Sequence, residues 1–200
     1  MTLFTKARLA GLLAIAMWLG VNNVYAMACY EKSPHLVAQQ DRYFTQDSYV
    51  VLSDDDKAVL NNLFNKLNGK WEGDSTHTVC SGPDSAPRQE TQHATVNAEV
   101  SAGTNVSISM LAEINYTEDK IARHQSINLS GNAGFYQLKI IGTDHVTISE
   151  KYRRSNINAS SRLIETIFDI ALEGDSFMMT ISYYTNGVLT GVDRWSLHQR

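Results

Sequence analysis

The chain has 200 residues, of which 43% are hydrophobic and 19% are charged, and its formal net charge is −4. This mixture is too apolar for a wholly disordered chain and too polar for a fibre or a membrane protein with several spans. The length allows one domain with a sizeable core. Because the balance of charge is acidic, the composition argues against nucleic acid as a partner.

The N-terminus has the features of a secretory signal. Lys6 and Arg8 supply positive charge, residues 9–21 form an apolar run, and Val24-Tyr25-Ala26 is a cleavage site with small residues. The apolar run is shorter than the roughly 20 residues of a membrane-spanning helix. We therefore expect residues 1–26 to be removed as a signal peptide, and the mature protein to be periplasmic or secreted with no membrane span.

The chain contains two cysteines, Cys29 and Cys80. In an oxidising compartment such a pair predicts a disulfide. The alternative is a lipid anchor at Cys29, which lies just after the cleavage site and would then be unable to pair. The residues before Cys29 fit a lipid-attachment site poorly, so the sequence favours the disulfide.

Residues 27–52 lack a steady period and are expected to form an extended N-terminal arm. A helix follows, with Ser53 as its N-cap and the acidic run 54–56 at its positive end. Asn68-Gly69 ends it. The apolar stripe of this helix consists of Val59, Leu60, Leu63, Phe64 and Leu67.

After Gly69 the apolar period changes from helical to two, which is typical of half-buried strands. Short turn sequences separate the runs, and Asn186-Gly187 suits a two-residue hairpin. Closure into a barrel removes the exposed edges of such a meander. We therefore predict a mainly β fold over residues 53–200: an antiparallel, up-and-down, closed barrel of eight to nine strands with a leading helix.

Two other β architectures fit less well. A sandwich needs longer crossover connections than the sequence provides. An outer-membrane barrel needs a continuous apolar face towards lipid, and charged residues such as Arg162, Glu165 and Asp169 fit water better.

The junction Gly69-Lys70-Trp71, directly after the helix, resembles the start of the lipocalin-like (calycin) barrels. The last strand, Val192 to Leu197, is similar to that family's final strand. The resemblance implies a barrel for a small ligand, with Trp71 in its floor and Arg194 packed over the indole ring. Such a contact is a cation–π interaction. On a regular strand, however, Arg194 and its neighbour Trp195 cannot both point inward.

Strand alternation also predicts which residues face the barrel interior and could line a binding site. Arg123 shares a face with Ile121 and Ile127, and its guanidinium suits an anionic head group. His77 shares a face with Trp71. Apolar walls with a few convergent polar groups are typical of small-molecule pockets. The predicted ligand-binding residues are Arg123, Glu150, Tyr152, Tyr183, Met110, Met179 and His77.

The sequence carries no catalytic or phosphate-binding motif of the common kinds. His77 and Cys80 are three residues apart on an expected strand, so they face opposite ways and do not suit a metal. We therefore expect no enzyme activity, no catalytic residues, no metal and no cofactor.

Two functions remain. The first is an exported, soluble protein that holds a small hydrophobic or amphipathic ligand inside the barrel. The alternative is a periplasmic protein-interaction or enzyme-inhibitor barrel, since such inhibitors also have a Gly-x-Trp strand followed by a cysteine. That barrel would have a filled interior and would act through loops such as 81–88 or 153–162.

Overall fold

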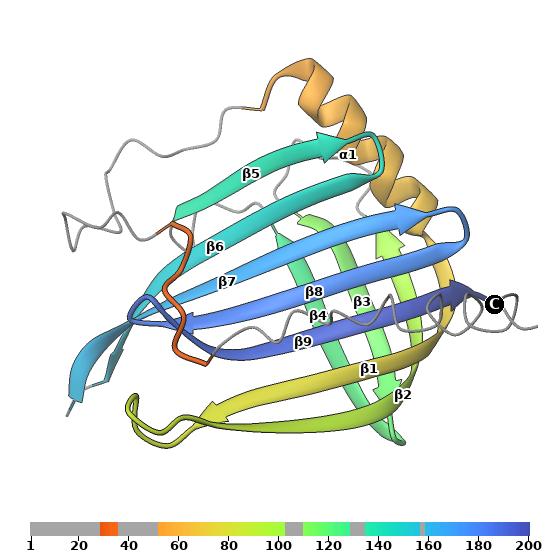
Figure 1. The fold of residues 1–200 in the computed structure, drawn as a ribbon. Helices are drawn as coiled ribbons and strands as arrows, with labels where there is room; N and C mark the ends of the chain where they lie inside the picture. The colour runs from red at the N-terminus through yellow and green to blue at the C-terminus, as the bar shows by residue number, and fades with distance from the viewer. Residues whose placement is uncertain (1–28, 36–51, 103–109, 129–134, 157–158) are drawn as a thin grey trace, which may run out of the picture.

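The computed structural model describes residues 29–35, 52–102, 110–128, 135–156 and 159–200. These residues form one helix, α1 (Asp54–Leu67), followed by nine strands (Figure 1). The strands are β1 (Gly69–Ser81), β2 (Arg88–Ala102), β3 (Met110–Glu118), β4 (Ile121–Asn128), β5 (Phe135–Gly142), β6 (His145–Asn156), β7 (Ala159–Glu173), β8 (Ser176–Thr185) and β9 (Val188–Gln199). The mainly β class, the leading helix and the number of strands are as the sequence predicts.

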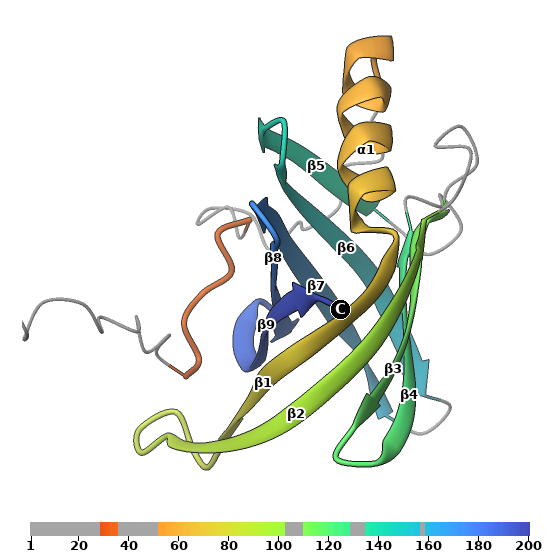
Figure 2. The same ribbon diagram turned by 90° about the vertical axis from the view of Figure 1, so that its right-hand side faces the viewer.

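The strands form one antiparallel sheet in the order β4-β3-β2-β1-β9-β8-β7-β6-β5. In a closed up-and-down barrel each strand pairs with the next, and the last pairs with the first. The described strands make all of these pairings except β4 with β5. The prediction of a closed barrel is therefore wrong, because the sheet curls into a half-barrel that is open between β4 and β5 (Figure 2).

Helix α1 begins where the sequence predicts. The backbone N–H of Asp56 donates to Ser53 Oγ, and the backbone N–H of Ser53 donates to the Asp56 carboxylate, each at 3.1 Å. This reciprocal capping box satisfies backbone donors that the first helical turn leaves without partners. The face of α1 towards the sheet is fully buried, through Leu60, Leu63, Phe64 and Leu67.

The helix closes one end of the half-barrel, which we call the helix end (Figure 2). The indole N–H of Trp71 donates to the Leu67 carbonyl at 2.8 Å, and its ring meets Phe177 edge-on. Lys66 pairs with Asp144 in the β5–β6 turn at 2.6 Å. The core therefore lies between α1 and the concave face of the sheet. We call the opposite end, where β1 turns into β2 and β3 into β4, the distal end.

The described part of the N-terminal arm lies beside the β8–β9 hairpin. Lys32 bridges to Val188, and backbone hydrogen bonds join Tyr30 and Glu31 to Leu189. Asn186 and Gly187 in this hairpin both have positive φ, as a type I′ turn requires. Residues 36–51 of the expected arm and the expected signal peptide lie outside the described residues.

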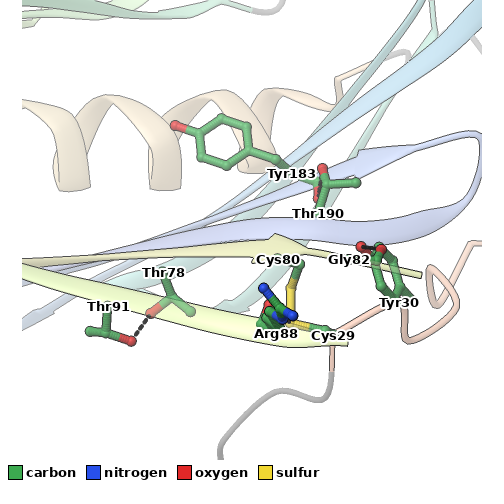
Figure 3. Close-up of a disulfide and its surroundings, with 9 residues drawn as sticks. All are labelled: Cys29, Tyr30, Thr78, Cys80, Gly82, Arg88, Thr91, Tyr183 and Thr190. Carbon is green, nitrogen blue, oxygen red and sulfur yellow. Dashed lines mark hydrogen bonds between the residues drawn. A yellow bond between two sulfur atoms is a disulfide. The ribbon is translucent and has the colours of Figure 1, made fainter. Parts of the chain in front are cut away.

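A disulfide joins Cys29 to Cys80 on β1, so that prediction is confirmed (Figure 3). The bridge uses the sulfur that a lipid anchor at Cys29 would need, so the two are mutually exclusive. A disulfide indicates an oxidising environment. Among the described residues, no helix is both long and apolar enough to cross a membrane.

Candidate functional site

Charged and polar side chains from five strands meet on the concave face. Arg123 Nε on β4 lies 3.2 Å from Glu118 Oε2 on β3. The other oxygen of Glu118 is bonded to His77 Nε2 on β1, and His77 Nδ1 lies 2.8 Å from Asp193 Oδ1 on β9. We call this chain of contacts, with the further members Ser75 and Tyr183, the polar network.

Two hydroxyl groups complete the network. The Ser75 hydroxyl donates to Glu118 Oε1 at 2.5 Å, and the Tyr183 hydroxyl on β8 donates to Asp193 Oδ2 at 2.8 Å. Each carboxylate is thus held by at least two partners, which is how a buried charge is compensated. Glu118 is only 4% exposed, whereas Arg123 at the outer end of the network has a side chain that is 50% exposed.

The strand register explains why these residues meet. His77 stands opposite Asp193 in the β1–β9 pairing, and Tyr183 stands opposite Gly191, two residues before Asp193. Strand β2 separates Glu118 from His77, and opposite Ser75 it carries only the small side chain of Ala94. Inward side chains two residues apart are diagonal neighbours across a strand pair.

Burial and the contacts within the network shift the pKa values of its members. Burial lowers the pKa of His77, but the hydrogen bonds to Glu118 and Asp193 outweigh burial and raise that pKa overall. Burial raises the pKa of Glu118, but Ser75, His77 and Arg123 together lower it below its ordinary value. Burial and the nearby Asp193 raise the pKa of Tyr183, so its hydroxyl stays protonated and remains a donor.

The arrangement is suited to binding through Arg123. Both ring nitrogens of His77 face carboxylates, so neither is directed at a substrate or at a metal. Within the described ranges, no cluster of His, Cys, Asp and Glu is arranged to hold a metal ion. Arg123 is different, because it meets Glu118 through Nε and a guanidinium carries four further N–H donors.

Apolar side chains lie on the same inward face at the distal end. Ile121 on β4 precedes Arg123 by two residues and is 58% exposed, and Val79 on β1 is 56% exposed. Tyr152 on β6 is also exposed. Large exposed apolar side chains next to convergent polar groups are a feature of binding surfaces.

The structure brings three predicted site residues, His77, Arg123 and Tyr183, into the network. Met179 points inward but is fully buried near the helix end, opposite Trp195, and belongs to the core. Glu150 and Tyr152 lie on the inward face of β6, two strands beyond Tyr183. Met110 begins β3, and its side chain lies outside the described part of the chain.

The predicted contact between Trp71 and Arg194 is wrong. Trp71 points inward, whereas Arg194 stands opposite Thr76 and Thr180 on the outer face of the sheet. Strand alternation requires this, because the neighbouring residue Trp195 is part of the core.

Glu118, Asp193 and Ser75 belong to the network but are not among the residues predicted from the sequence. Glu118 stands in the turn-like sequence Thr117-Glu118-Asp119, yet it continues the even-numbered inward series that includes Ile114 and Tyr116. Asp193 is likewise in phase with Trp195 and Leu197. A carboxylate in phase with the core residues of its own strand was therefore the signal that could have found Glu118 and Asp193.

A second buried cluster lies on the outer face. Glu165 on β7 is 1% exposed and accepts hydrogen bonds from Ser33 at 2.5 Å and Ser149 at 3.0 Å. His35 Nδ1 and Lys151 Nζ lie 2.7 and 3.4 Å from its Oε1. Because the cluster is buried and includes Ser33 and His35, we interpret it as the anchor of the N-terminal segment 29–35.

Comparison with models of known protein families gave no match, and a search of curated proteins gave none either.

Proposed function

We propose that the protein is an exported binding protein that holds a small hydrophobic or amphipathic ligand on the distal half of its concave face. The observation that carries the proposal is Arg123, which is half exposed, oriented by Glu118, and two residues from the exposed apolar side chain of Ile121 on the inward face. An arginine held in this way can bind the polar end of a ligand through its remaining donors.

The distribution of packing favours the distal half. Towards the helix end the concave face is filled by α1 and by large, fully buried side chains. These include Phe64, Trp71, Phe168, Phe177 and Met179. Beyond the polar network, Val79 and Ile121 are more than half exposed. Covering them with an apolar ligand would remove that area from water, which is favourable.

A relationship to the lipocalin-like barrels remains part of the proposal. The pairing of the last strand with the first, and the helix that leads into Trp71, support it. The disulfide supports the expected export to the periplasm or beyond.

Two fluorescent probes that share one aromatic frame test the proposal. N-phenyl-1-naphthylamine is neutral, and 8-anilinonaphthalene-1-sulfonate carries a permanent anion. We expect both to bind to the folded protein. Hydrogen bonds to charged groups contribute about 1.5–3 kcal/mol. Arg123→Gln should therefore lower the affinity for the sulfonate probe about tenfold or more. The same change leaves the affinity for the neutral probe within about twofold.

Arg194→Gln is the matched control, because Arg194 lies on the outer face. It should alter neither affinity. Failure of both probes to bind to the folded wild-type protein would contradict the proposal. Equal effects of the two substitutions would show that the probes bind elsewhere.

The protein-interaction function is the second candidate, and one observation favours it. Residues 82–87 between β1 and β2 are all exposed, and the disulfide at Cys80 fixes the base of this loop. A fixed, exposed loop suits recognition of a protein surface. The two candidates differ in the probe experiment, since a loop that binds proteins requires no probe binding on the concave face.

A further inference from the structure

When His77 is protonated, the polar network carries equal numbers of positive and negative charges. Arg123 and His77 then carry two positive charges, and Glu118 and Asp193 carry two negative charges. All four are joined through the contacts of His77 and Glu118. Loss of one proton from His77 leaves the network with a net charge of −1.

The other groups that face His77 do not change this balance. Ser75 on the same strand has no titratable proton in this range, and Tyr183 on β8 donates its proton to Asp193. Tyr116 on β3 packs edge-on against Trp195, and burial together with Glu118 raises the pKa of its hydroxyl. His77 is therefore the group in the network whose charge changes near neutral pH.

We propose that an anionic ligand binds at Arg123 together with one proton that is taken up by His77. This inference rests on the proposed function and assigns to that site both a ligand charge and a control by pH. The physical reason is competition for Arg123. When His77 is neutral, the Glu118 carboxylate has one cationic partner fewer. It therefore binds Arg123 more strongly, and its negative charge repels an anionic ligand.

Protonated His77 reverses both effects. It shares the negative charge of Glu118 through Nε2 and that of Asp193 through Nδ1, so the network is neutral once Arg123 is counted in it. By reciprocity, a bound anion must favour the protonated form of His77 to the same extent. The raised pKa of His77 in the free protein agrees in direction with this role.

The test measures the affinity of both probes from about pH 6 up to about pH 9, that is, upward from the ordinary pKa range of histidine. The sulfonate stays ionised throughout, so changes in its affinity report on the protein. We expect the affinity for the sulfonate probe to fall about tenfold as pH rises through the pKa of His77. A change of this size is typical of coupled sites. The neutral probe should show no such change.

His77→Gln and His145→Gln are the matched variants. Glutamine cannot titrate, so His77→Gln should bind the sulfonate weakly at every pH in the range. His145 lies on the outer face, where it forms a similar pair with Asp169 at 2.6 Å. His145→Gln should therefore keep the pH dependence of the wild type.

A second readout needs no variant. NMR titration of the His77 ring in the wild-type protein should give a higher pKa with the sulfonate probe bound than without it. Sulfonate affinity that is independent of pH, or a His77 pKa that the probe leaves unchanged, would overturn the proton coupling alone. If neither probe binds to the folded wild-type protein, the proposed function fails and the coupling with it.

Discussion

Removal of the disulfide gives the most direct test of how the N-terminal segment is held. The bridge joins residues separated by 51 positions. In the chain-entropy model, closing a loop of this length lowers the entropy of the unfolded chain by about 14 cal/mol/K, or about 4 kcal/mol at 25 °C. We therefore expect the double variant Cys29→Ser, Cys80→Ser to lose about 3–4 kcal/mol of unfolding free energy.

The structure also predicts that the folded state survives this change. Segment 29–35 keeps its backbone hydrogen bonds to Gly187 and Leu189 and its contacts with Glu165 when the bridge is removed. The effect should therefore arise in the unfolded chain. Because a chain without the cross-link exposes more surface on unfolding, the m-value in urea should rise as the midpoint falls.

Urea unfolding, followed by circular dichroism, measures both quantities. The samples are the wild type, the double variant, and the wild type reduced with dithiothreitol, which should match the variant. A loss below about 1 kcal/mol in the variant would refute the entropic argument. Intact-mass measurement of the exported protein supplies the control. Two free thiols, or an acyl group on Cys29, would show that the bridge is absent.

Two further predictions concern single positions. An added Cβ at Gly73 would lie 2.2 Å from the Ser196 carbonyl oxygen, so Gly73→Ala should destabilise the β1–β9 pairing by about 3 kcal/mol or prevent folding. Gly142→Ala meets nothing within 4 Å and should change the unfolding free energy by less than about 0.5 kcal/mol in the same denaturation assay. Glu165→Ala removes the buried carboxylate that Ser33, His35 and Lys151 contact and should cost about 3–5 kcal/mol. Asp169→Ala, which removes the half-exposed partner of His145, should cost less than about 1 kcal/mol. Equal losses at Glu165 and Asp169 in thermal unfolding would contradict the anchoring role of Glu165.

The local features of the fold could be predicted from the sequence because each has a local cause. Ser53 and the acidic residues after it specify the start of α1 through short-range hydrogen bonds. The change of apolar period after Gly69 specifies strands, and short turns such as Asn186-Gly187 specify their up-and-down order. The disulfide followed from the presence of only two cysteines in a chain expected to be exported.

Whether the sheet closes into a complete barrel could not be predicted in the same way. Pairing of β4 with β5 depends on the curvature accumulated over nine strands, and alternation within a strand does not encode that curvature. The polar network shows a related limit. Alternation places His77 and Arg123 on the inward face. The register across β2 brings Glu118 to His77, and the pairing of β3 with β4 brings it to Arg123.

The open side of the half-barrel raises the question of why its edges do not pair with other chains. Unpaired strand edges invite aggregation, and charged side chains on them oppose it. Strand β4 carries exposed Arg123 and His124, and β5 carries exposed Lys139. At the helix end, α1 lies between the two sides and is tied to the β5–β6 turn through Lys66. Arg123 therefore has two effects from one position. It is an inward-pointing charge that discourages a foreign strand from extending β4, and it is the cation that the proposed anionic ligand would meet first.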